Sequence, residues 1–288
     1  MKPANLKTKI FLDSGDPNET KEAIKLLGFL DGQTTNPTLI SKNPKAKVRL
    51  ERGEKFTKDE IFGFYKEVVQ EISSLIKDGS VSVEVYADKN TTAEQMLRQG
   101  REMFFWIPNA HIKYPITKVG LESAENSVKD GMRVNMTLCF SQEQAAGVYA
   151  ATVGAKKSEI FVSPFIGRLD DRAENGMDLI ENIIRMYKKG DGHVEVLTAS
   201  VRNLDHFLYA IKLGSDIITA PFKVLKEWGD KGLSMPKPDF AYSTSLKPIP
   251  YEEIDLNKPW RNYNITNDLT DIGIEKFSSD WNQLLLNK

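Results

Sequence analysis

The sequence predicts an α/β fold, a single (β/α)8 TIM barrel with a C-terminal arm, from three observations. Eight short apolar stretches are each followed by a segment whose apolar residues recur with helical spacing. The connections between these segments are short, and no linker-like segment divides them. The 288 residues are enough for one large barrel domain. Eight strand–helix units in this length favour a barrel over an open sheet.

The expected strands are short runs of apolar and β-branched residues, and several of them end in polar residues. The second run breaks into a turn before Pro37, which disfavours helical backbone at the preceding residue. The expected strands occupy residues 9–14, 28–37, 81–86, 110–115, 133–138, 159–163, 193–199 and 215–219.

The expected helices follow the strands and place apolar residues on one face. The first begins after Asp16 and Pro17, because aspartate is a favoured N-cap and proline is tolerated at the first helical position. Residues 41–56 are charged and weakly patterned, so we expect a loop there. The expected helices occupy residues 19–27, 58–77, 91–105, 117–129, 141–152, 176–189, 203–213 and 221–228.

The C-terminal residues differ in character from the barrel segment. Residues 234–260 are rich in proline and tyrosine and lack periodicity, whereas residues 267–286 have the apolar pattern of an amphipathic helix. We expect this arm to pack across the barrel, because it contains large apolar residues. The domain prediction is one barrel domain over residues 1–288, with 234–288 as its arm and terminal helix.

The composition argues against several classes of function. The formal net charge of −1 gives no general attraction to nucleic acid or anionic membranes. Cys139 is the only cysteine, so no intramolecular disulfide is possible, which suits a reducing cytosol. The sequence has no apolar signal segment and no run of membrane-spanning length. We expect a cytoplasmic protein without nucleic-acid or membrane partners; the oligomeric state stays open, with a homodimer as one expectation.

We expect neither a metal ion nor a cofactor. The three histidines, His111, His193 and His206, are scattered, and no Cys or His pair has the spacing of metal ligands. The sequence also lacks a glycine-rich phosphate loop and a dinucleotide-binding fingerprint.

Lys113 lies in the middle of the expected strand at 110–115. Because strand side chains alternate, it faces opposite to Ile112 and Tyr114. A lysine that points inward from a strand flanked by helices is costly unless it has a partner or a task. One interpretation is a Schiff-base lysine, since desolvation lowers the pKa of an amine and the neutral amine can attack a carbonyl. The alternative is a surface lysine on an edge strand.

Further polar residues lie at the expected C-terminal ends of strands, where barrels of this type place their chemistry. Some have structural alternatives: Asp13 and Ser163 could cap helices, and Thr137 could be an ordinary strand residue. Glu84 is harder to explain structurally, because it lies between two valines. Together the residues supply a nucleophile, an acid/base pair and groups that orient a polyol. The set is Asp13, Asn36, Glu84, Lys113, Asn135, Thr137 and Ser163.

Two later segments place an arginine beside a small hydroxyl residue at a strand-to-helix junction. They are SPFIGR at 163–168 and ASVRN at 199–203, which contain Arg168, Ser200 and Arg202. Arginine forks and backbone amides at helix starts suit a phosphate, and barrels often bind phosphate in their late loops. The alternative is a pair of surface arginines neutralised by Asp170, Asp171 or Asp205.

These motifs resemble the transaldolase family, a class I aldolase lineage on a (β/α)8 barrel. The resemblance covers roughly residues 9–230 in the family's order, and the terminal helix resembles the one that closes larger members. The sequence departs from the family's motifs at Gln33, Tyr114 and Val119, and these departures leave the preference for the acceptor sugar open. Of the three, Tyr114 should face the helix layer. The motifs are FLD at 11–13, DGQTTNPTLI at 31–40, VEV at 83–85, KYPIT at 113–117, NMTLCFS at 135–141, 163–168 and 199–203.

The resemblance implies a role for each site residue. Lys113 would form the Schiff base, and Asp13 would take the hydroxyl proton during retro-aldol cleavage. Glu84 with Thr137 would hold a water that moves protons. Three residues, Asn36, Asn135 and Ser163, would orient substrate hydroxyls, and another three, Arg168, Ser200 and Arg202, would hold the terminal phosphate. No cofactor is implied, because the protonated imine is itself the electron sink.

The implied activity is that of a transaldolase of the pentose phosphate pathway. It would move a dihydroxyacetone unit from sedoheptulose 7-phosphate or fructose 6-phosphate to an aldose phosphate, with small-molecule sugar phosphates as its partners. The nearest alternative is an enzyme like fructose-6-phosphate aldolase, which releases free dihydroxyacetone. In that branch a tyrosine resembles Phe165, and the phenylalanine here favours transfer. A barrel that binds sugar phosphate without turnover is a further alternative, against which the lysine–aspartate–glutamate set argues.

Overall fold

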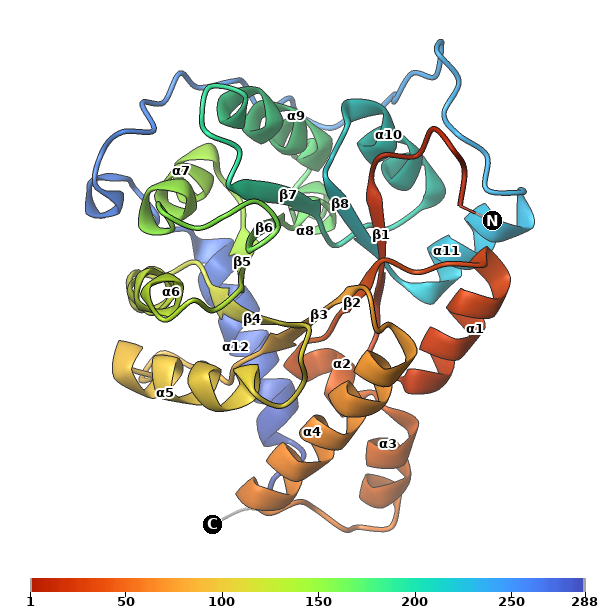
Figure 1. The fold of residues 1–288 in the computed structure, drawn as a ribbon, viewed down its shortest axis with the longest axis vertical. Helices are drawn as coiled ribbons and strands as arrows, with labels where there is room; N and C mark the ends of the chain where they lie inside the picture. Colours follow the sequence, from red (N-terminus) through yellow and green to blue (C-terminus); the bar gives the residue numbers. More distant parts are fainter. Residues whose placement is uncertain (1, 287–288) are drawn as a thin grey trace.

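The computed structural model describes residues 2–286 and shows a closed barrel of eight parallel strands, which confirms the predicted fold class. Residues 1, 287 and 288 of the predicted domain lie outside the described residues. The strands form the centre of Figure 1, with helices around them. The strands are β1 Lys9–Asp13, β2 Gly32–Thr34, β3 Ser80–Glu84, β4 Ala110–Pro115, β5 Val134–Cys139, β6 Ile160–Pro164, β7 Val194–Thr198 and β8 Ile217–Ala220.

Each predicted helix between or after the strands is present, with small shifts at its ends. Asp16 caps the first helix and Pro17 is its first residue, as the sequence indicates. Thr57 and Glu60 form a capping box at the start of the longest one. These helices are α1 Pro17–Leu27, α4 Lys58–Leu75, α5 Ala93–Phe104, α6 Lys118–Lys129, α7 Gln142–Ala151, α9 Gly176–Tyr187, α10 Leu204–Leu213 and α11 Phe222–Asp230.

The loop predicted at residues 41–56 is wrong in part, because the segment contains a helix. Two short helices, α2 Pro37–Ser41 and α3 Pro44–Glu51, follow β2. Asn43 caps α3 and Pro44 is its first residue, so local start signals were present. Only Ala46 is buried in α3, which explains why the apolar pattern was weak. A further short helix, α8 Ile166–Asp170, follows β6 and was not predicted.

The inside of the barrel is filled by its own apolar cluster, separate from the larger core between strands and helices. Phe11 of β1 and Phe161 of β6 meet edge to face with their ring centroids 6.1 Å apart. His111 of β4 stacks on Phe161 at 4.0 Å. Burial lowers the pKa of His111 to about 3, so its ring is neutral at ordinary pH. The barrel floor is therefore packed, and only one end is left for chemistry.

The arm passes around the outside of the barrel and is tied to successive helices (Figure 1). The Asn175 N–H, just before α9, donates a hydrogen bond to the Lys247 carbonyl of the arm. Asn182 of α9 donates to the Ile249 carbonyl. Gln142 of α7 makes two hydrogen bonds with the backbone of Glu252. The Trp260 indole then donates to Glu125 of α6 at 3.0 Å.

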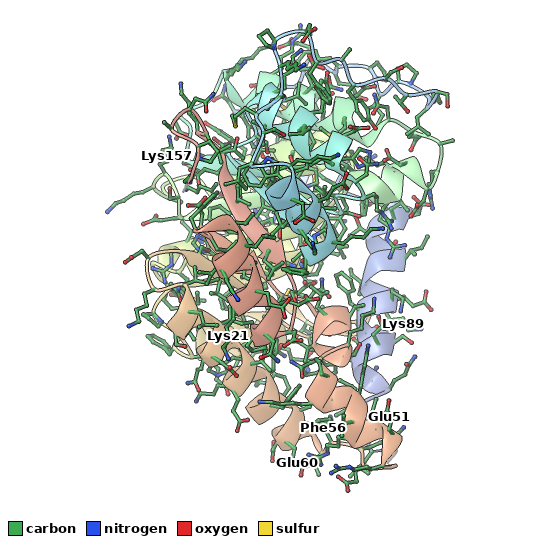
Figure 2. The ribbon with its side chains drawn as sticks, turned by 90° about the vertical axis from the view of Figure 1, so that its right-hand side faces the viewer. Lys21, Glu51, Phe56, Glu60, Lys89 and Lys157 are labelled. Carbon is green, nitrogen blue, oxygen red and sulfur yellow. The ribbon has the colours of Figure 1, made fainter. Side chains whose placement is uncertain are left out.

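The terminal helix, α12 Asp268–Asn282, crosses the end of the barrel where the strands finish. Figure 2 shows the molecule from the side: Lys157, which precedes β6, and Lys89, which follows β3, lie on opposite sides. Helix α12 lies on the side of Lys89, against α2 and β5. After α12 the chain pairs Leu285 with Phe56. Within residues 2–286, no helix combines the length and the apolar character needed to span a membrane.

Candidate active site

A cavity of about 390 Å³, here called the mouth cavity, opens where the strands end. Its wall includes eight of the predicted residues: Asp13, Asn36, Lys113, Ser163, Phe165, Arg168, Ser200 and Arg202. The other three predicted residues are buried on β3 and β5, the two strands that flank β4. Glu84 is on β3, and Asn135 and Thr137 are on β5. The fold therefore gathers residues from across the sequence at one end of the barrel.

Lys113 and Glu84 form a buried ion pair. The strand register places Glu84 of β3 directly beside Lys113 of β4, and Lys113 beside Asn135 of β5. Lys113 Nζ lies 2.8 Å from Glu84 Oε2, and each side chain is only 3% exposed. The ammonium also donates to the Thr35 carbonyl at 3.0 Å. This burial excludes the alternative of a surface lysine on an edge strand.

The electrostatics of Glu84 favour proton exchange at this position. Burial raises the pKa of the Glu84 carboxyl, while the nearby Lys113 ammonium partly opposes that shift. The ion pair is close, yet Glu84 Oε2 receives no well-oriented hydrogen bond from the described residues. Thr137 Oγ1 is also buried and has no hydrogen-bond partner among the described residues. Buried polar atoms are normally satisfied by protein or water, so both atoms are suited to contact water or substrate.

Asp13 ends β1 and faces the mouth cavity. Burial raises the pKa of its carboxyl, and the Lys113 ammonium, a hydrogen bond from Thr34 and the Lys42 ammonium oppose this effect. The Thr34 hydroxyl donates to Asp13 Oδ1 at 2.7 Å and also contacts the Thr219 hydroxyl at 2.6 Å. Asp13 does not cap α1, because Asp16 does so. Its carboxylate is therefore left to act in the cavity.

Three predicted hydroxyl-orienting residues lie around Lys113. Ser163 donates to Asn135 Oδ1 at 2.6 Å, and Asn135 in turn donates to Ser82 at 3.1 Å. Asn36 caps α2, accepting from the Leu39 backbone N–H at 2.9 Å. Asn36 therefore has a structural role as a cap and also lines the mouth cavity.

The late loops bring Arg168, Ser200 and Arg202 together. Arg202 donates to Asp171 at 2.8 Å and to the Gly167 carbonyl at 3.3 Å, whereas Arg168 is 3.9 Å from Asp171. The backbone of Ser200 has a φ of 58°, a strained conformation for a residue with a side chain. Both arginines are about half exposed. An anion in the cavity would compete with Asp171 for them.

Gly167 is needed for this close approach of the two loops. Its N–H donates to the Ser200 carbonyl at 3.1 Å. A Cβ atom at position 167 would lie 2.2 Å from Arg202 Nε and 2.5 Å from the Ser200 carbonyl oxygen. Only a glycine at position 167 therefore allows the Arg202 side chain to pack against α8.

Phe165 lies between β6 and α8 on the cavity wall. Its ring meets Phe140 edge to face at 6.1 Å, and its backbone pairs with Ala199 after β7. Phe277 of α12 lines the same cavity. An apolar surface thus covers one side of the space above Lys113.

The departures at Gln33 and Tyr114 do not reach the mouth cavity. Gln33 is buried, accepts from Thr20 of α1 at 2.7 Å and donates to the Ser14 carbonyl at 2.8 Å. The Tyr114 hydroxyl lies 3.0 Å from that of Ser127 in α6, so this side chain faces the helix layer as predicted. Val119 lies on α6 and lines a different groove.

Sequence reasoning missed several residues of the mouth cavity. Lys42 lies in a segment that we expected to be a featureless loop, and Lys276 lies on the terminal helix, where a charged residue gives no signal of its own. The missed residues that line the cavity include Thr34, Thr38, Lys42, Thr219, Lys276 and Phe277. Among the described residues, no group of His, Cys, Asp and Glu side chains is arranged to hold a metal ion.

The pH dependence of the reaction should reveal the hydrogen bond between Thr34 and Asp13. If Asp13 acts as a carboxylate, activity falls as pH decreases through its raised pKa, above the range of an exposed aspartate. Thr34→Val removes a hydrogen bond that stabilises the carboxylate, so the acid limb of kcat/KM should move to higher pH. Thr219→Val keeps that bond and should move the limb less. An unchanged limb in Thr34→Val would assign it to another group.

A family model and several known proteins that are similar to this chain point to the same family. The family model described as Transaldolase/Fructose-6-phosphate aldolase matches residues 10–288. A protein of Dehalococcoides mccartyi named "Probable transaldolase" is 40% identical over 219 residues, which cover 76% of this chain and 89% of the relative. Two further proteins have the same printed name. The one from Roseiflexus sp. is 36% identical, covering 95% of this chain and 96% of its own. The one from Caldicellulosiruptor saccharolyticus is 34% identical, covering 96% and 98%.

Proposed function

The chain belongs to the transaldolase/fructose-6-phosphate aldolase family of enzymes, and we propose that it transfers a dihydroxyacetone unit between sugar phosphates through a Schiff base on Lys113. The observation that supports this most is the buried Lys113–Glu84 ion pair, with Asp13 facing the same cavity. Relatives named "Probable transaldolase" support transfer as the outcome. We propose the cytoplasm and the pentose phosphate pathway as its setting, on the family resemblance.

The proposed reaction begins with attack of the Lys113 amine on the ketose carbonyl. Glu84, 2.8 Å from Lys113 Nζ, accepts the ammonium proton, and its raised pKa allows it to return a proton to the departing hydroxyl. Loss of water leaves a protonated imine at Lys113. The hydroxyl of Thr137, which has no hydrogen-bond partner among the described residues, is suited to hold the water that relays these protons.

Cleavage then needs a base, and we assign that role to Asp13. Its carboxylate takes the proton of the hydroxyl at C4, the C3–C4 bond breaks, and the bonding electrons move into the imine. An aldose phosphate leaves, and the dihydroxyacetone unit stays on Lys113 as an enamine. Attack of the enamine on the aldehyde of a second aldose phosphate reverses these steps, with Asp13 returning the proton, and hydrolysis of the new imine releases the product.

We assign the sugar hydroxyls and the terminal phosphate of the substrate to two different groups of residues. Asn36, Asn135 and Ser163 offer amide and hydroxyl groups to the sugar hydroxyls. We assign the terminal phosphate to Arg168, Arg202 and Ser200, where guanidinium groups from two loops converge.

The competing outcome is release of dihydroxyacetone, and one assay separates it from transfer. Release requires the enamine to be protonated and the imine hydrolysed before an acceptor arrives. Phe165 has no hydroxyl that could bind a water there, and Phe140 packs beside it. Turnover of fructose 6-phosphate alone should be slow, and erythrose 4-phosphate should accelerate it greatly. Rapid release of dihydroxyacetone without acceptor would instead support the aldolase outcome.

Phe165→Tyr should increase acceptor-free release at the expense of transfer. The phenol would place a polar group on the wall of the mouth cavity, where it can bind water near the imine. The measurement is the ratio of dihydroxyacetone released to ketose formed, in both proteins. Phe140→Tyr changes the neighbouring ring and serves as the control. A change in thermal stability with an unchanged ratio would show that Phe165 only packs.

The arginines should discriminate in favour of phosphorylated substrates. Arg168→Ala and Arg202→Ala should each weaken the binding of phosphorylated substrates by about 1–2 kcal/mol. This is less than a buried charge-assisted contact contributes, because both side chains are half exposed. Non-phosphorylated sugars should change little. Arg172→Ala, which breaks an exposed ion pair with Asp268, is the control. Equal losses for both sugar types would make the arginines structural.

A further inference from the structure

The wall of the mouth cavity contains more positive charge than one phosphate requires. Its charged residues are one carboxylate, Asp13, and five cations: Lys42, Lys113, Arg168, Arg202 and Lys276. The mechanism uses Lys113, and the phosphate assignment uses the two arginines. Neither assignment uses Lys42 or Lys276 to bind a ligand, although the Lys42 ammonium partly offsets the raised pKa of Asp13. Lys113, Arg202 and Lys276 each have a carboxylate partner, whereas Lys42 has none among the described residues.

The two unassigned lysines lie across the barrel from Arg168. Lys42 ends α2, which follows β2, whereas Arg168 lies on α8, which follows β6. In a closed ring of eight strands, β2 and β6 are opposite each other. Lys276 lies on α12, which packs against α2. The cavity therefore has an arginine side and a lysine side.

The structure fixes the positions from which the two lysines extend. Asp280 accepts hydrogen bonds from both Lys276 and Thr38, which ties α12 to α2. Next to Lys42, the buried Asn43 donates to the Gly15 carbonyl at 2.7 Å and caps α3. Lys42 itself forms no ion pair with the described residues. Its ammonium is therefore available to a ligand, and Lys276 would share its ammonium with Asp280.

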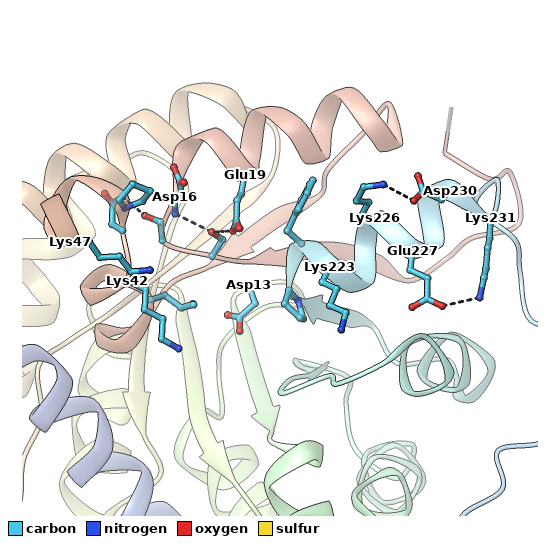
Figure 3. A pocket seen from close by; sticks show the side chains of 17 residues that line it. Asp13, Asp16, Glu19, Lys42, Lys47, Lys223, Lys226, Glu227, Asp230 and Lys231 are labelled. Carbon is cyan, nitrogen blue, oxygen red and sulfur yellow. Dashed lines mark hydrogen bonds and ion pairs between the residues drawn. The ribbon is translucent and has the colours of Figure 1, made fainter.

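Lys42 also stands at the boundary with a second hollow of about 890 Å³. The two spaces share Asp13, Leu39, Lys42 and Pro221. In Figure 3 the Lys42 side chain extends in the same direction as the Asp13 carboxylate, toward the side where α12 lies. In this hollow Lys226 and Lys231 are paired with Asp230 and Glu227, whereas Lys47 and Lys223 form no ion pair with the described residues. Of the unpaired lysines that line this hollow, Lys42 is the one that also lines the mouth cavity.

We propose that Lys42 and Lys276 form a second anion subsite of the mouth cavity, which receives a second phosphate monoester of a sugar already held by the arginine side. This inference rests on the proposed function, because it takes the arginines as the first phosphate site. It extends the ligand class from sugar monophosphates to sugars with phosphates at both ends. Such a ligand spans the cavity and neutralises both sides at once.

The test compares a bisphosphate with a monophosphate. Fructose 1,6-bisphosphate should inhibit transfer competitively, and more strongly than inorganic phosphate. Lys42→Met and Lys276→Met should each raise the ratio of its Ki to the KM of fructose 6-phosphate about 3- to 10-fold, as expected for partly exposed charge pairs. Lys42→Arg and Lys276→Arg should restore the ratio. Working well above the acid limb keeps Asp13 ionised in every variant.

Two lysines provide matched controls. Lys226→Met removes a lysine that pairs with an aspartate four residues later, as Lys276 does, and Lys47→Met removes a lysine on the adjacent helix α3. Neither lines the mouth cavity, so the ratio should stay within about 2-fold of the native value. An unchanged ratio in the Lys42 and Lys276 variants, or inhibition no stronger than by inorganic phosphate, would overturn the second subsite. Loss of the Schiff base at Lys113 would instead overturn the proposed function.

Discussion

Replacing Lys113 with alanine is expected to lower kcat at least about 1,000-fold, because no other group can take over its covalent role. Lys113 is the buried lysine of the mouth cavity, and its Nζ lies 2.8 Å from Glu84. Alanine leaves the Glu84 carboxyl buried without its cation. That carboxyl already has a raised pKa, so it should bind a proton rather than remain charged.

A control must separate lost chemistry from lost stability, since breaking a buried ion pair costs about 3–5 kcal/mol in other proteins. Lys9 of β1, whose side chain is about a third exposed, pairs with the buried Glu195 of β7, 2.9 Å apart, on a part of the barrel away from the mouth cavity. Lys9→Ala should lower the melting temperature but retain turnover. Comparable loss of turnover in both variants would mean that Lys113 acts through stability alone.

Asp13→Asn should produce the second large effect, lowering kcat about 100- to 10,000-fold. Asparagine keeps the shape and can still bond to Thr34, but it cannot take a proton from the substrate hydroxyl. Formation of the imine should persist, because Lys113 and Glu84 are unchanged. Borohydride should therefore still label this variant. Asp16→Asn, which preserves the N-cap of α1, is the matched control and should remain active.

Loss of labelling together with turnover in Asp13→Asn would contradict this division of roles. It would place Asp13 in the formation of the imine, alongside Glu84. Normal turnover would remove Asp13 from the chemistry altogether.

Strand periodicity explains why much of the site was predictable from the sequence. Side chains alternate along a strand, so the opposite directions of Lys113 and Tyr114 follow from their spacing, and the burial of Lys113 shows which of them points inward. The parallel barrel then brings the C-terminal strand ends together, whatever their separation in the sequence. The pairing of Lys113 with Glu84, in contrast, depends on the register of β3 against β4, which no local pattern encodes.

The lysine side of the cavity was not predictable, because it results from packing between distant segments. Helix α3 exposes most of its surface, so its apolar pattern was too weak to distinguish it from a loop. Lys276 enters the cavity only because α12 crosses the barrel end and is tied to α2 through Asp280. Cap residues such as Asn43 marked the helix start and would have been the best available signal.

Reductive trapping detects the covalent intermediate on Lys113 on which the proposed reaction depends. The protein is incubated with fructose 6-phosphate and borohydride, digested, and its peptides are mapped by mass spectrometry. We expect one stable adduct, on the peptide that contains Lys113, and none in Lys113→Ala. An adduct on a different lysine, or no adduct while the protein turns over substrate, would contradict the proposed reaction.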